Sequence, residues 1–268
     1  MSLAIATWNI NSVRLRIELV LQFLKEHNID ILCLQETKCH DDSFPLGKFK
    51  EAGYEYTAYY GEKSYNGVAI ISKVPLSSVE KKQFCDKNDC RHISAIFDLY
   101  GHSVLLHNFY VPAGGDIPNA DLNPKFKHKL DFLQEMQSIT SSTINGLPSI
   151  LVGDLNIAPL ECDVWSHKQL LDVVSHTPIE TETLLALLRD GNWVDLVRHH
   201  IKPPQKIYSW WSYRAKDWRL SNRGRRLDHI WVSPELIKLD TDIKIMSELR
   251  GAVQPSDHVP LIAYFNIT

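Results

Sequence analysis

The chain has 268 residues, of which 44% are hydrophobic and 23% are charged, and its formal net charge is −3. This length permits a substantial hydrophobic core, and we expect residues 1–268 to form a single domain. No apolar run approaches the length needed to cross a bilayer, and no basic region precedes the short apolar run at the amino terminus. These features argue against a membrane protein, and we expect a cytoplasmic protein that acts as a monomer.

Strand-like apolar runs recur along the whole chain. In chain order they cover residues 3–8, 30–35, 66–72, 92–100, 102–111, 149–152, 227–233 and 259–265. The turn-like sequence "DLYGHS" joins two of these runs, which predicts a hairpin and therefore mixed rather than wholly parallel sheets. A Gly/Pro-rich loop at 111–124 separates two strand-rich halves, but each half alone would leave a sheet face uncovered, so we treat the loop as internal to one domain.

Two segments between the strand-like runs have helical spacing. Apolar residues recur every three or four positions in 13–24, with Ser12 as a candidate N-cap, and again in 126–133 behind Asn123 and Pro124. Because strands are numerous and helices lie between them, we expect an α/β fold. In this fold two mixed β-sheets pack face to face with helices outside.

The five cysteines are odd in number, which does not favour a disulfide framework. Cys33 lies inside the apolar run "DILCLQ", where a small buried thiol is ordinary. Cys85 and Cys90 lie close to His92, as in a fragment of a zinc site, but no second ligand pair follows at a matching spacing. We therefore expect reduced structural thiols.

A basic segment stands out of this mildly acidic chain. Residues 198–226 contain nine Lys or Arg residues and the single acid Asp217, with Tyr and Trp residues between the cations. Cations interleaved with flat rings suit phosphates and unstacked bases, which favours nucleic-acid binding. Taken alone, the segment also fits a solvated loop whose aromatic side chains cap the core.

Polar side chains collect where the strand-like runs begin or end. In "PSILVGDLNIAP", Asp154 and Asn156 follow a buried run two residues apart, and in an extended chain both would face one side while Leu155 points away. Other runs begin or end near Asn9, Glu36, Tyr110, Asp228, Asp257 and His258. Any one of these residues is usual at a turn or a helix cap, but together they indicate an active site.

This set of side chains is dominated by oxygen donors. Four carboxylates, two carboxamides and one histidine favour Mg²⁺ or Mn²⁺ over zinc. Hard cations of this kind suit chemistry on phosphate oxygens. In "QPSDHVP" the adjacent Asp257 and His258 can orient an imidazole and hold a metal or a phosphate from neighbouring positions.

Several of these segments together resemble a known family. The segments "TWNIN", "LQETK", "NGVAI", "GDLNIAP", "NRGRRLDHI" and "SDHVPL" occur in this order and cover nearly the whole chain. With them the chain resembles the exonuclease III family of apurinic/apyrimidinic endonucleases, within the endonuclease/exonuclease/phosphatase superfamily. Phospholipid and inositol phosphatases of that superfamily share "SDH", whereas "LQETK" with "GDLNIAP" is much more specific to the DNA repair branch.

The resemblance implies a four-layer α/β sandwich, a divalent metal ion and hydrolysis of a phosphodiester. It makes Glu36 the main metal ligand, with Asn9 and Asp257 close to the metal. Asp154 would align and deprotonate the attacking water, and Asn156 would hold that water or the phosphate. The full metal set implied by the family is Asn9, Glu36, Asp154, Asn156, Asp257 and His258.

The remaining roles implied by the resemblance concern the phosphate. His258, paired with Asp228, would bind the scissile phosphate oxygen, and Tyr110 would steady the phosphate or the departing oxygen. The metal would be Mg²⁺, and Mn²⁺ could substitute for it. A metal, an imidazolium and hydroxyl or amide donors all neutralise the charge that accumulates on a pentavalent phosphorus.

The implied substrate is double-stranded DNA with abasic sites or blocked 3′ ends. The expected reactions are incision 5′ to abasic sites, 3′-to-5′ exonuclease action and cleaning of 3′ ends. The implied DNA-binding residues are Trp210, Arg214, Asn222, Arg223 and Arg225. Trp210 would line a pocket for the base-free sugar while Trp211 packs in the core, and the opposite strand register would exchange the two roles.

The sequence departs from the family pattern in two places. Ser212 stands where the family often has an acid, and the loop "AKDWRLSNRG" is one residue longer, so these motifs do not determine substrate preference.

Two other functions are alternatives to a DNA repair nuclease. A phosphatase of inositol phosphates or a sphingomyelinase-like esterase would keep the same site without needing the basic, Trp-rich segment. A DNA-binding module without catalysis would tolerate gaps in the ligand set, yet every acid is present.

Overall fold

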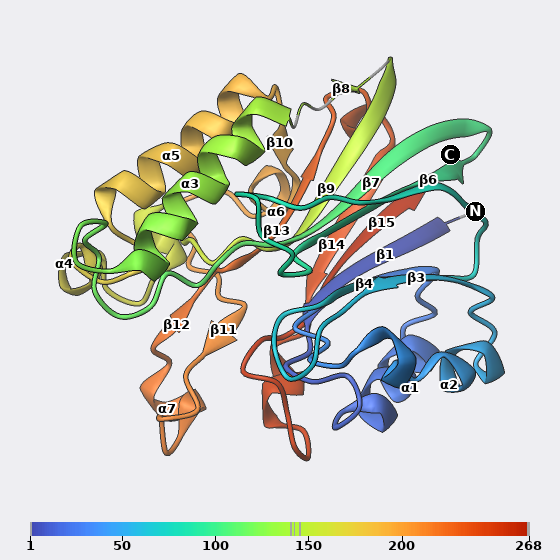
Figure 1. The fold of residues 1–268 in the computed structure, drawn as a ribbon, viewed down its shortest axis with the longest axis horizontal. Helices are drawn as coiled ribbons and strands as arrows, with labels where there is room; N and C mark the ends of the chain where they lie inside the picture. Colours follow the sequence, from blue (N-terminus) through green and yellow to red (C-terminus); the bar gives the residue numbers. More distant parts are fainter. Residues whose placement is uncertain (1, 140, 142, 145, 267–268) are drawn as a thin grey trace.

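The computed structural model describes residues 2–139, 141, 143–144 and 146–266, which form two mixed β-sheets packed face to face (Figure 1). The first sheet has the strand order β14 (Asp240–Ile245), β15 (Leu261–Asn266), β1 (Ser2–Asn9), β2 (Ile31–Gln35), β4 (Val68–Ser72) and β3 (Tyr56–Tyr60). Strand β1 runs parallel to β2 and antiparallel to β15, which makes the sheet mixed, as expected from the sequence.

The second sheet is also mixed and carries a small satellite strand. Its order is β10 (Val194–Asp195), β13 (Asp228–Val232), β9 (Leu147–Asp154), β7 (His102–Tyr110), β6 (His92–Leu99) and β5 (Leu76–Lys81), and β8 (Thr143–Ile144) pairs with β9. Strands β6 and β7 form the predicted hairpin. A separate ribbon consists of β11 (Trp210–Trp211) and β12 (Gly224–Arg225).

Helices cover the outer faces of both sheets. Helices α1 (Ile17–Glu26) and α2 (Leu46–Glu51) lie on the first sheet, and α3 (Pro124–Ile139) and α5 (Pro178–Asp190) lie on the second (Figure 1). Shorter helices are α4 (His167–Leu170), α6 (Leu196–His200) and α7 (Trp218–Ser221), with 3₁₀ turns at Asp41–Ser43, Glu161–Asp163, Leu236–Lys238 and Ser247–Gly251. None of the described helices is long and apolar enough to span a membrane.

Three apolar clusters hold the layers together. Ile5 of the first sheet and Val152 of the second belong to the cluster between the sheets. Phe23 packs α1 against the first sheet, and Phe132 packs α3 against the second. The expected four-layer α/β sandwich is therefore confirmed, with each sheet face buried by apolar side chains.

The first predicted helix starts later than the sequence suggested. Ser12 is not its N-cap: Ser12 has a φ of +87° and its backbone N–H donates to the carbonyl of Glu36 at 2.8 Å. This pairing with the segment after β2 delays the helix until Ile17. By contrast, α3 begins at Pro124 as predicted, and the Asn123 side chain accepts the backbone N–H of Lys125 at 3.0 Å.

The sequence patterns missed the strands at the sheet edges. β3, β5 and β14 are edge strands without a continuous run of buried apolar residues: β5 is nearly all exposed, β14 alternates exposed and half-buried residues, and only Ala58 is buried in β3. Gly153 lies on β9 within the second sheet, opposite Phe109 of β7. It has a φ of +144°, and an added Cβ would lie 1.9 Å from the Phe109 carbonyl oxygen, so only glycine lets β9 approach β7 here.

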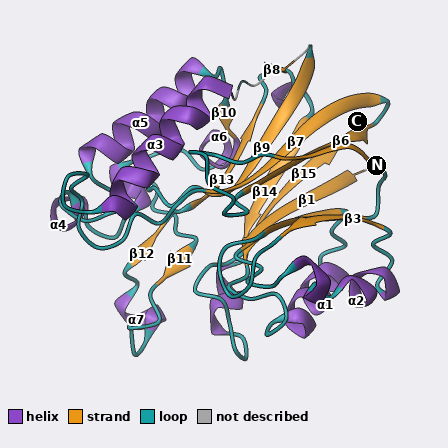
Figure 2. Cartoon of the chain, viewed as in Figure 1, coloured by secondary structure: helices purple, strands orange, loops and turns teal. Residues whose placement is uncertain are grey.

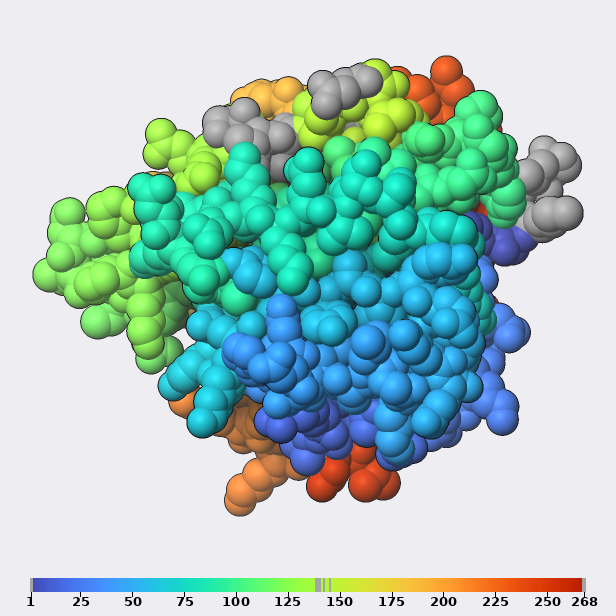
Figure 3. All heavy atoms as spheres, turned by 45° about the vertical axis from the view of Figure 1, so that its right-hand side comes forward, coloured from blue at the N-terminus to red at the C-terminus, as the bar shows by residue number. Residues whose placement is uncertain are grey.

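Loops and short helices gather at the end of the sheets where β1 and β9 finish (Figure 2). The ribbon of β11 and β12, with α7 at its tip, projects on this side. In the space-filling view, the green segment that contains the 111–124 loop and the orange segment that contains α7 both protrude from the body of the molecule (Figure 3). This loop-rich end is where the polar residues identified in the sequence meet.

Candidate active site

Strand register brings the sequence-predicted polar residues to one end of both sheets. Asn9 is the last residue of β1, and Glu36 directly follows β2, its parallel neighbour. In the second sheet Tyr110 pairs with Asp154, and Asp154 pairs with Asp228, across adjacent strands. The strand ends therefore place all five side chains around one position between the sheets.

Asn9 joins the two sheets at this position. Its side-chain nitrogen donates to Glu36 Oε1 at 2.9 Å and to Asp154 Oδ2 at 2.8 Å. Tyr110 donates its hydroxyl to Glu36 Oε1 at 2.9 Å, and Lys38 Nζ lies 2.6 Å from Glu36 Oε2. Burial alone would raise the pKa of Glu36, but Lys38 and Asn9 outweigh burial and lower it, so this carboxylate is ionised.

The backbone at Glu36 is unusual for a residue with a side chain. Glu36 has a φ of +51°, a left-handed conformation that costs free energy and is common at active sites. The segment "LQETK" is held in place by the segment "NGVAI", because Thr37 donates its N–H to the Gly67 carbonyl. A Cβ on Gly67 would lie 2.1 Å from Thr37 Oγ1, so the close contact requires glycine.

Asp154 and Asn156 lie together in the site, as predicted, but a turn rather than the alternation of an extended strand brings them together. The strand ends at Asp154, and Asn156 has a φ of +54°, so the alternation of an extended chain does not apply. Instead the chain turns, and Asn156 donates its backbone N–H to Asp154 Oδ1 at 2.9 Å and its side-chain N–H to Asp154 Oδ2 at 3.2 Å. A second side-chain hydrogen bond to the Val111 carbonyl, at 2.9 Å, fixes the amide.

His258 and Asp228 form a buried hydrogen-bonded pair beside Asp154. His258 Nδ1 lies 2.8 Å from Asp228 Oδ2, and His258 Nε2 lies 3.6 Å from Asp154 Oδ2. Ser209 Oγ accepts the backbone N–H of Asp228, and Ser256 Oγ accepts that of His258. These serines hold the backbone of both residues, and the contact with Asp228 orients the imidazole.

Asp154 and His258 both have strongly shifted pKa values. Burial raises the pKa of Asp154 well above its usual range, and the nearby Asp228 carboxylate raises it further while His258 opposes the change. Burial alone would lower the pKa of His258, but the carboxylates of Asp228 and Asp154 outweigh it and raise the pKa to about 10. A cationic imidazole therefore faces a carboxyl group that can take up a proton.

Asp257 is held at the edge of the site by its neighbours. Its carboxylate accepts the Trp210 indole N–H at 3.0 Å and the Asn11 side-chain N–H at 3.1 Å. Trp210 is half-buried, whereas Trp211 is only 4% exposed and packs in an apolar cluster. The prediction that Trp211 rather than Trp210 packs in the core is confirmed.

The donor chemistry of the site fits a divalent cation. Asp154, Asp228 and His258 offer donor atoms within 4.8 Å of one another, and Glu36 is linked to Asp154 through Asn9. In the part of the chain that the structure describes, Asp228 Oδ1 is buried without a hydrogen-bond partner. Because His258 Nδ1 already bonds Asp228, we regard that pair as an orienting contact and Glu36 with Asp154 as the better oxygen site.

A fully buried ion pair supports the turn that carries Asn156. Lys129 of α3 pairs with Glu180 of α5, and Lys129 Nζ also donates to the Asn156 carbonyl at 2.8 Å. Glu180 in turn accepts the backbone N–H of Ser175 at 2.9 Å. The pair thus ties the loop after Asp154 to both helices of the second sheet.

The basic segment 198–226 divides into buried and exposed cations. Arg198 and Arg226 are buried and bond Asp163, so they stabilise the fold instead of facing solvent. Arg214 and Arg223 are exposed, and the Arg223 guanidinium lies 4.7 Å from the centre of the Trp165 ring.

The other two polar residues predicted to bind DNA have structural contacts. Arg225 donates to the Val174 carbonyl and to Ser175 Oγ and lies 5.3 Å from the centre of the Trp210 ring. Asn222 accepts the Trp211 indole N–H at 3.1 Å.

Sequence reasoning missed four residues that shape the site. They are Lys38, Lys129, Ser209 and Ser256, which contact Glu36, Asn156, Asp228 and His258 respectively. Lys38 follows Glu36 by two residues within "LQETK", so the motif itself contained a signal. Lys129 could not be found, since a lysine in an amphipathic helix is normally solvated.

The fold and the site together define an α/β sandwich with an oxygen-rich acid–base site at its strand ends. Residues 6–258 match the model of the endonuclease/exonuclease/phosphatase family. Exodeoxyribonuclease III of Haemophilus influenzae is 29% identical over 97% of this chain and 98% of that protein. The exodeoxyribonuclease of Bacillus subtilis is 31% identical, with the same coverage of 97% and 98%.

Solved structures agree with these sequence relatives. An AP endonuclease from Archaeoglobus fulgidus has a TM-score of 0.88 and 33% identity, covering 99% of this chain and 100% of that one. A 3′ phosphatase from Neisseria, bound to a product DNA hairpin, has a TM-score of 0.84 and 29% identity over 99% and 100% of the two chains. The chain belongs to the exonuclease III family, within the endonuclease/exonuclease/phosphatase superfamily.

Proposed function

We propose that this protein is a metal-dependent DNA repair nuclease that hydrolyses the backbone 5′ to abasic sites and also trims and cleans 3′ ends. The observation that carries the proposal is the buried set Asp154, Asp228 and His258 with Asn156 and Glu36, because it combines a proton acceptor, a cationic clamp and an ionised ligand. The relatives named as exodeoxyribonucleases, an AP endonuclease and a 3′ phosphatase support this range of reactions.

The proposed metal is Mg²⁺, and Mn²⁺ should substitute for it. Glu36 would be its main ligand, since this carboxylate is ionised and lies 2.9 Å from the Asn9 amide that also bonds Asp154. The wider set proposed near the metal is Asn9, Glu36, Asp154, Asn156, Asp257 and His258. When bound, a hard divalent cation supplies positive charge to phosphate oxygens.

Asp154 is the proposed general base. Its buried carboxylate has a raised pKa, which makes it a better proton acceptor than an exposed aspartate once it is ionised. The backbone and side-chain N–H groups of Asn156 hold both carboxylate oxygens, so Asp154 has a fixed orientation toward the attacking water. Asn156 is the second group proposed to position that water or the phosphate.

His258 is the proposed electrostatic clamp on the scissile phosphate. Its pKa of about 10 keeps the imidazole protonated at neutral pH, and Asp228 on Nδ1 leaves Nε2–H as the donor that faces the site. Tyr110 donates its hydroxyl to Glu36 here, and burial raises its pKa, so it stays a neutral donor suited to a phosphate or leaving oxygen. Charge on the phosphate is thus stabilised by donors that are already oriented.

Exposed cations and Trp210 are proposed to bind double-stranded DNA with abasic sites or blocked 3′ ends. Arg214 and Arg223 present charge to solvent beside the site, while Asn222 and Arg225 hold the ribbon that carries Trp210. The half-buried face of Trp210 is proposed to accept a sugar without its base. We further propose that the protein acts as a single-domain monomer in the cytoplasm.

A panel of labelled duplexes tests the function directly. Abasic, 3′-phosphate, blunt and recessed duplexes are incubated with Mg²⁺, with and without chelator, beside an inositol phosphate as the competing substrate class. We expect incision at the abasic site and 3′-phosphate removal, both abolished by chelator and slowed on the order of a hundredfold or more by Asp154→Asn. The exposed control Asp121→Asn should keep full activity, and release of phosphate from the inositol substrate alone would refute the proposal.

A further inference from the structure

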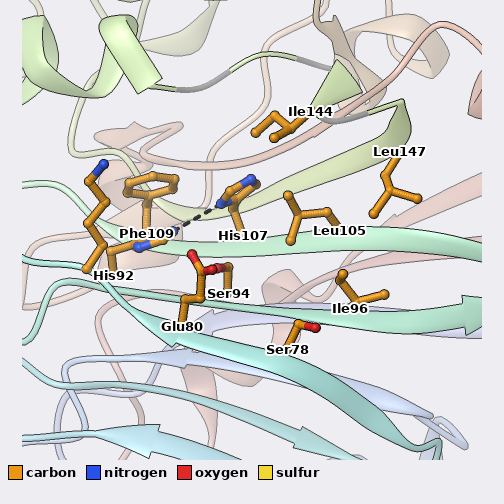
Figure 4. Close-up of a pocket in the computed structure, with 11 residues that line it drawn as sticks. Ser78, Glu80, His92, Ser94, Ile96, Leu105, His107, Phe109, Ile144 and Leu147 are labelled. Carbon is orange, nitrogen blue, oxygen red and sulfur yellow. Dashed lines mark hydrogen bonds between the residues drawn. The ribbon is translucent and has the colours of Figure 1, made fainter.

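A pair of buried histidines lies on the outer face of the second sheet, outside the candidate active site. His92 on β6 and His107 on β7 are 3% and 6% exposed, and both line a cavity of about 200 Å³ (Figure 4). His92 Nε2 lies 3.1 Å from His107 Nδ1. The other nitrogen of each ring is buried and has no hydrogen-bond partner in the described part of the chain, which is costly for a polar group.

Strand register places a carboxylate in line with this pair. Glu80 on β5 pairs with Ser94 on β6, and Ser94 pairs with His107 on β7. A β-bulge between Ser77 and Glu80 sets this register, because a regular ladder would place Val79 opposite Ser94. Figure 4 shows the Glu80 side chain extending toward the imidazoles beside the small Ser94.

We propose that His92, His107 and Glu80 bind one divalent transition-metal ion, for which zinc is the best match. Zinc–nitrogen bonds are about 2.0–2.1 Å long, so two nitrogens 3.1 Å apart on one ion subtend an angle of about 98°, close to tetrahedral. Two histidines and one glutamate, with water in the fourth position, form a known zinc donor set. Imidazole ligands also separate this site from the oxygen-rich active site, which suits Mg²⁺.

Both imidazoles are in the state that a metal ion requires. Burial lowers the pKa of His92 well below its usual value and that of His107 to about 4, so both rings are neutral at neutral pH. Among the residues that the structure describes, neither outer nitrogen has a hydrogen-bond partner, so each ring can carry its proton there and direct the lone pair of its inner nitrogen at the ion. Binding therefore needs a change of tautomer but no net release of protons.

Two features of the cavity oppose zinc binding and limit its affinity. Lys82 lines the same cavity, and its charge repels a cation just as it lowers the pKa of both histidines. Glu80 is exposed, and in this conformation its carboxylate is not within 4.8 Å of both imidazole donors, so it must rotate to complete the site. These features predict moderate affinity.

The sequence places His92 near Cys85 and Cys90, as in a fragment of a zinc site, but the missing second ligand pair argues against zinc there. Among the described residues the structure likewise groups neither cysteine with His92 as metal ligands. Its partner is His107, on the adjacent strand of the hairpin. A ligand pair formed across a hairpin has no fixed spacing in the sequence, so no motif could reveal it.

Zinc binding by the full chain tests the proposal. Equilibrium dialysis against Zn²⁺ is carried out in excess Mg²⁺, which occupies oxygen sites and competes poorly for imidazole. We expect wild-type protein to hold one more zinc ion per chain than His107→Gln. The control His102→Gln removes an exposed histidine from the same strand and should match wild type. Equal zinc content in wild type and folded His107→Gln would overturn the proposal.

Two surface substitutions test the proposed zinc site even if His107→Gln does not fold. Glu80→Gln should weaken zinc binding on the order of tenfold, because it removes the anionic ligand. Lys82→Met should tighten binding severalfold, because it removes a repelling charge. If both variants bind zinc with wild-type affinity, the ion lies elsewhere and the assignment is wrong.

Discussion

Two buried networks in this protein each combine aspartate with histidine, yet their ionisation is opposite. In the candidate active site, Asp154 lies among other carboxylates and beside His258, and burial raises its pKa. In the other network, Asp163 bonds the guanidinium groups of Arg226 and Arg198. Burial alone would raise the pKa of Asp163 as well, but the two arginines outweigh burial and lower it.

The pKa values of the histidines in the two networks are also shifted in opposite directions. Burial, followed by Arg226, lowers the pKa of His229 to about 4, and its Nε2 bonds the Ile157 carbonyl. In contrast, the carboxylates of Asp228 and Asp154 raise the pKa of His258 to about 10. The comparison teaches that burial does not by itself mark a catalytic acid or base. What decides is whether the buried group faces a permanent cation or other titrating groups.

The largest expected effect comes from Asp154→Asn. The substitution keeps the shape of the side chain but removes the proposed proton acceptor, so the cleavage rate should fall on the order of a hundredfold or more. Thermal stability should be unchanged or slightly higher, because one of two neighbouring buried carboxylates is lost. Single-turnover cleavage of abasic DNA and a thermal melt measure the two quantities, and a comparable loss in DNA affinity would make Asp154 a binding residue.

Asp163→Asn is the matched change in the other network. It leaves two buried arginines without their shared anion, so the free energy of unfolding should drop by about 3–5 kcal/mol. Urea denaturation measures this loss. Protein that remains folded should cleave abasic DNA at nearly the wild-type rate. A catalytic defect with unchanged stability would show that the two networks are not distinct in function.

The active-site network could be predicted from the sequence, whereas the network around Asp163 could not. Asp154 and Asp228 stand at the ends of apolar runs, where a polar residue is conspicuous and its neighbours are set by strand pairing. Asp163 lies in a 3₁₀ turn, and its partner Arg226 follows 63 residues later within a basic segment that looked solvated. Only tertiary packing shows that this arginine points inward.

The sequence also predicted only part of the fold: the buried strands could be predicted, but the edge strands could not. Buried strands such as β4 and β15 contain continuous apolar runs, so their positions followed from the sequence. Edge strand β14 alternates exposed and half-buried residues, and β5 is nearly all exposed, so neither contains such a run. The geometry at Asn156 was also hidden, because a left-handed residue after a strand depends on the contacts that hold it.

The two neighbouring tryptophans repeat the comparison on a smaller scale. Trp211→Ala should lower the free energy of unfolding by about 3–5 kcal/mol, because it opens a cavity in an apolar cluster. Trp210→Ala should leave stability nearly intact and lower the cleavage rate at abasic sites, since its half-buried face is the proposed sugar contact. Melting temperatures and abasic-site cleavage rates of both variants measure this. If Trp210→Ala is the less stable variant, the assignment is reversed.

Acid titration sharpens the comparison between the histidines. His229 has a folded-state pKa of about 4 and an ordinary value near 6.5 when unfolded, so the unfolded chain binds more protons between these limits. Stability should therefore fall as the pH drops from about 6.5 toward 4, by about 1 kcal/mol per pH unit for this residue. Urea midpoints across this range measure the slope, to which other buried histidines with lowered pKa values, such as His92 and His107, also contribute. His229→Gln should reduce the slope by its own share, whereas the exposed control His199→Gln should leave the slope unchanged.

The smallest expected effect separates an exposed arginine from a buried one in the same basic segment. Arg223 is exposed over the Trp165 ring, and Arg226 is buried against Asp163. Arg223→Glu should weaken binding to all duplexes alike and reduce the slope of log affinity against log salt by about one, because phosphate contacts release counterions without reading sequence.

The matched variant Arg226→Gln should instead lower stability and leave the salt slope of the folded protein unchanged. Binding isotherms at several salt concentrations, measured on folded protein of each variant, give both slopes. An unchanged slope for Arg223→Glu would assign Arg223 to a solvated loop with no role in binding DNA. A reduced slope for Arg226→Gln would mean that disturbing the buried network moves the DNA-binding surface, and the two regions would then be coupled.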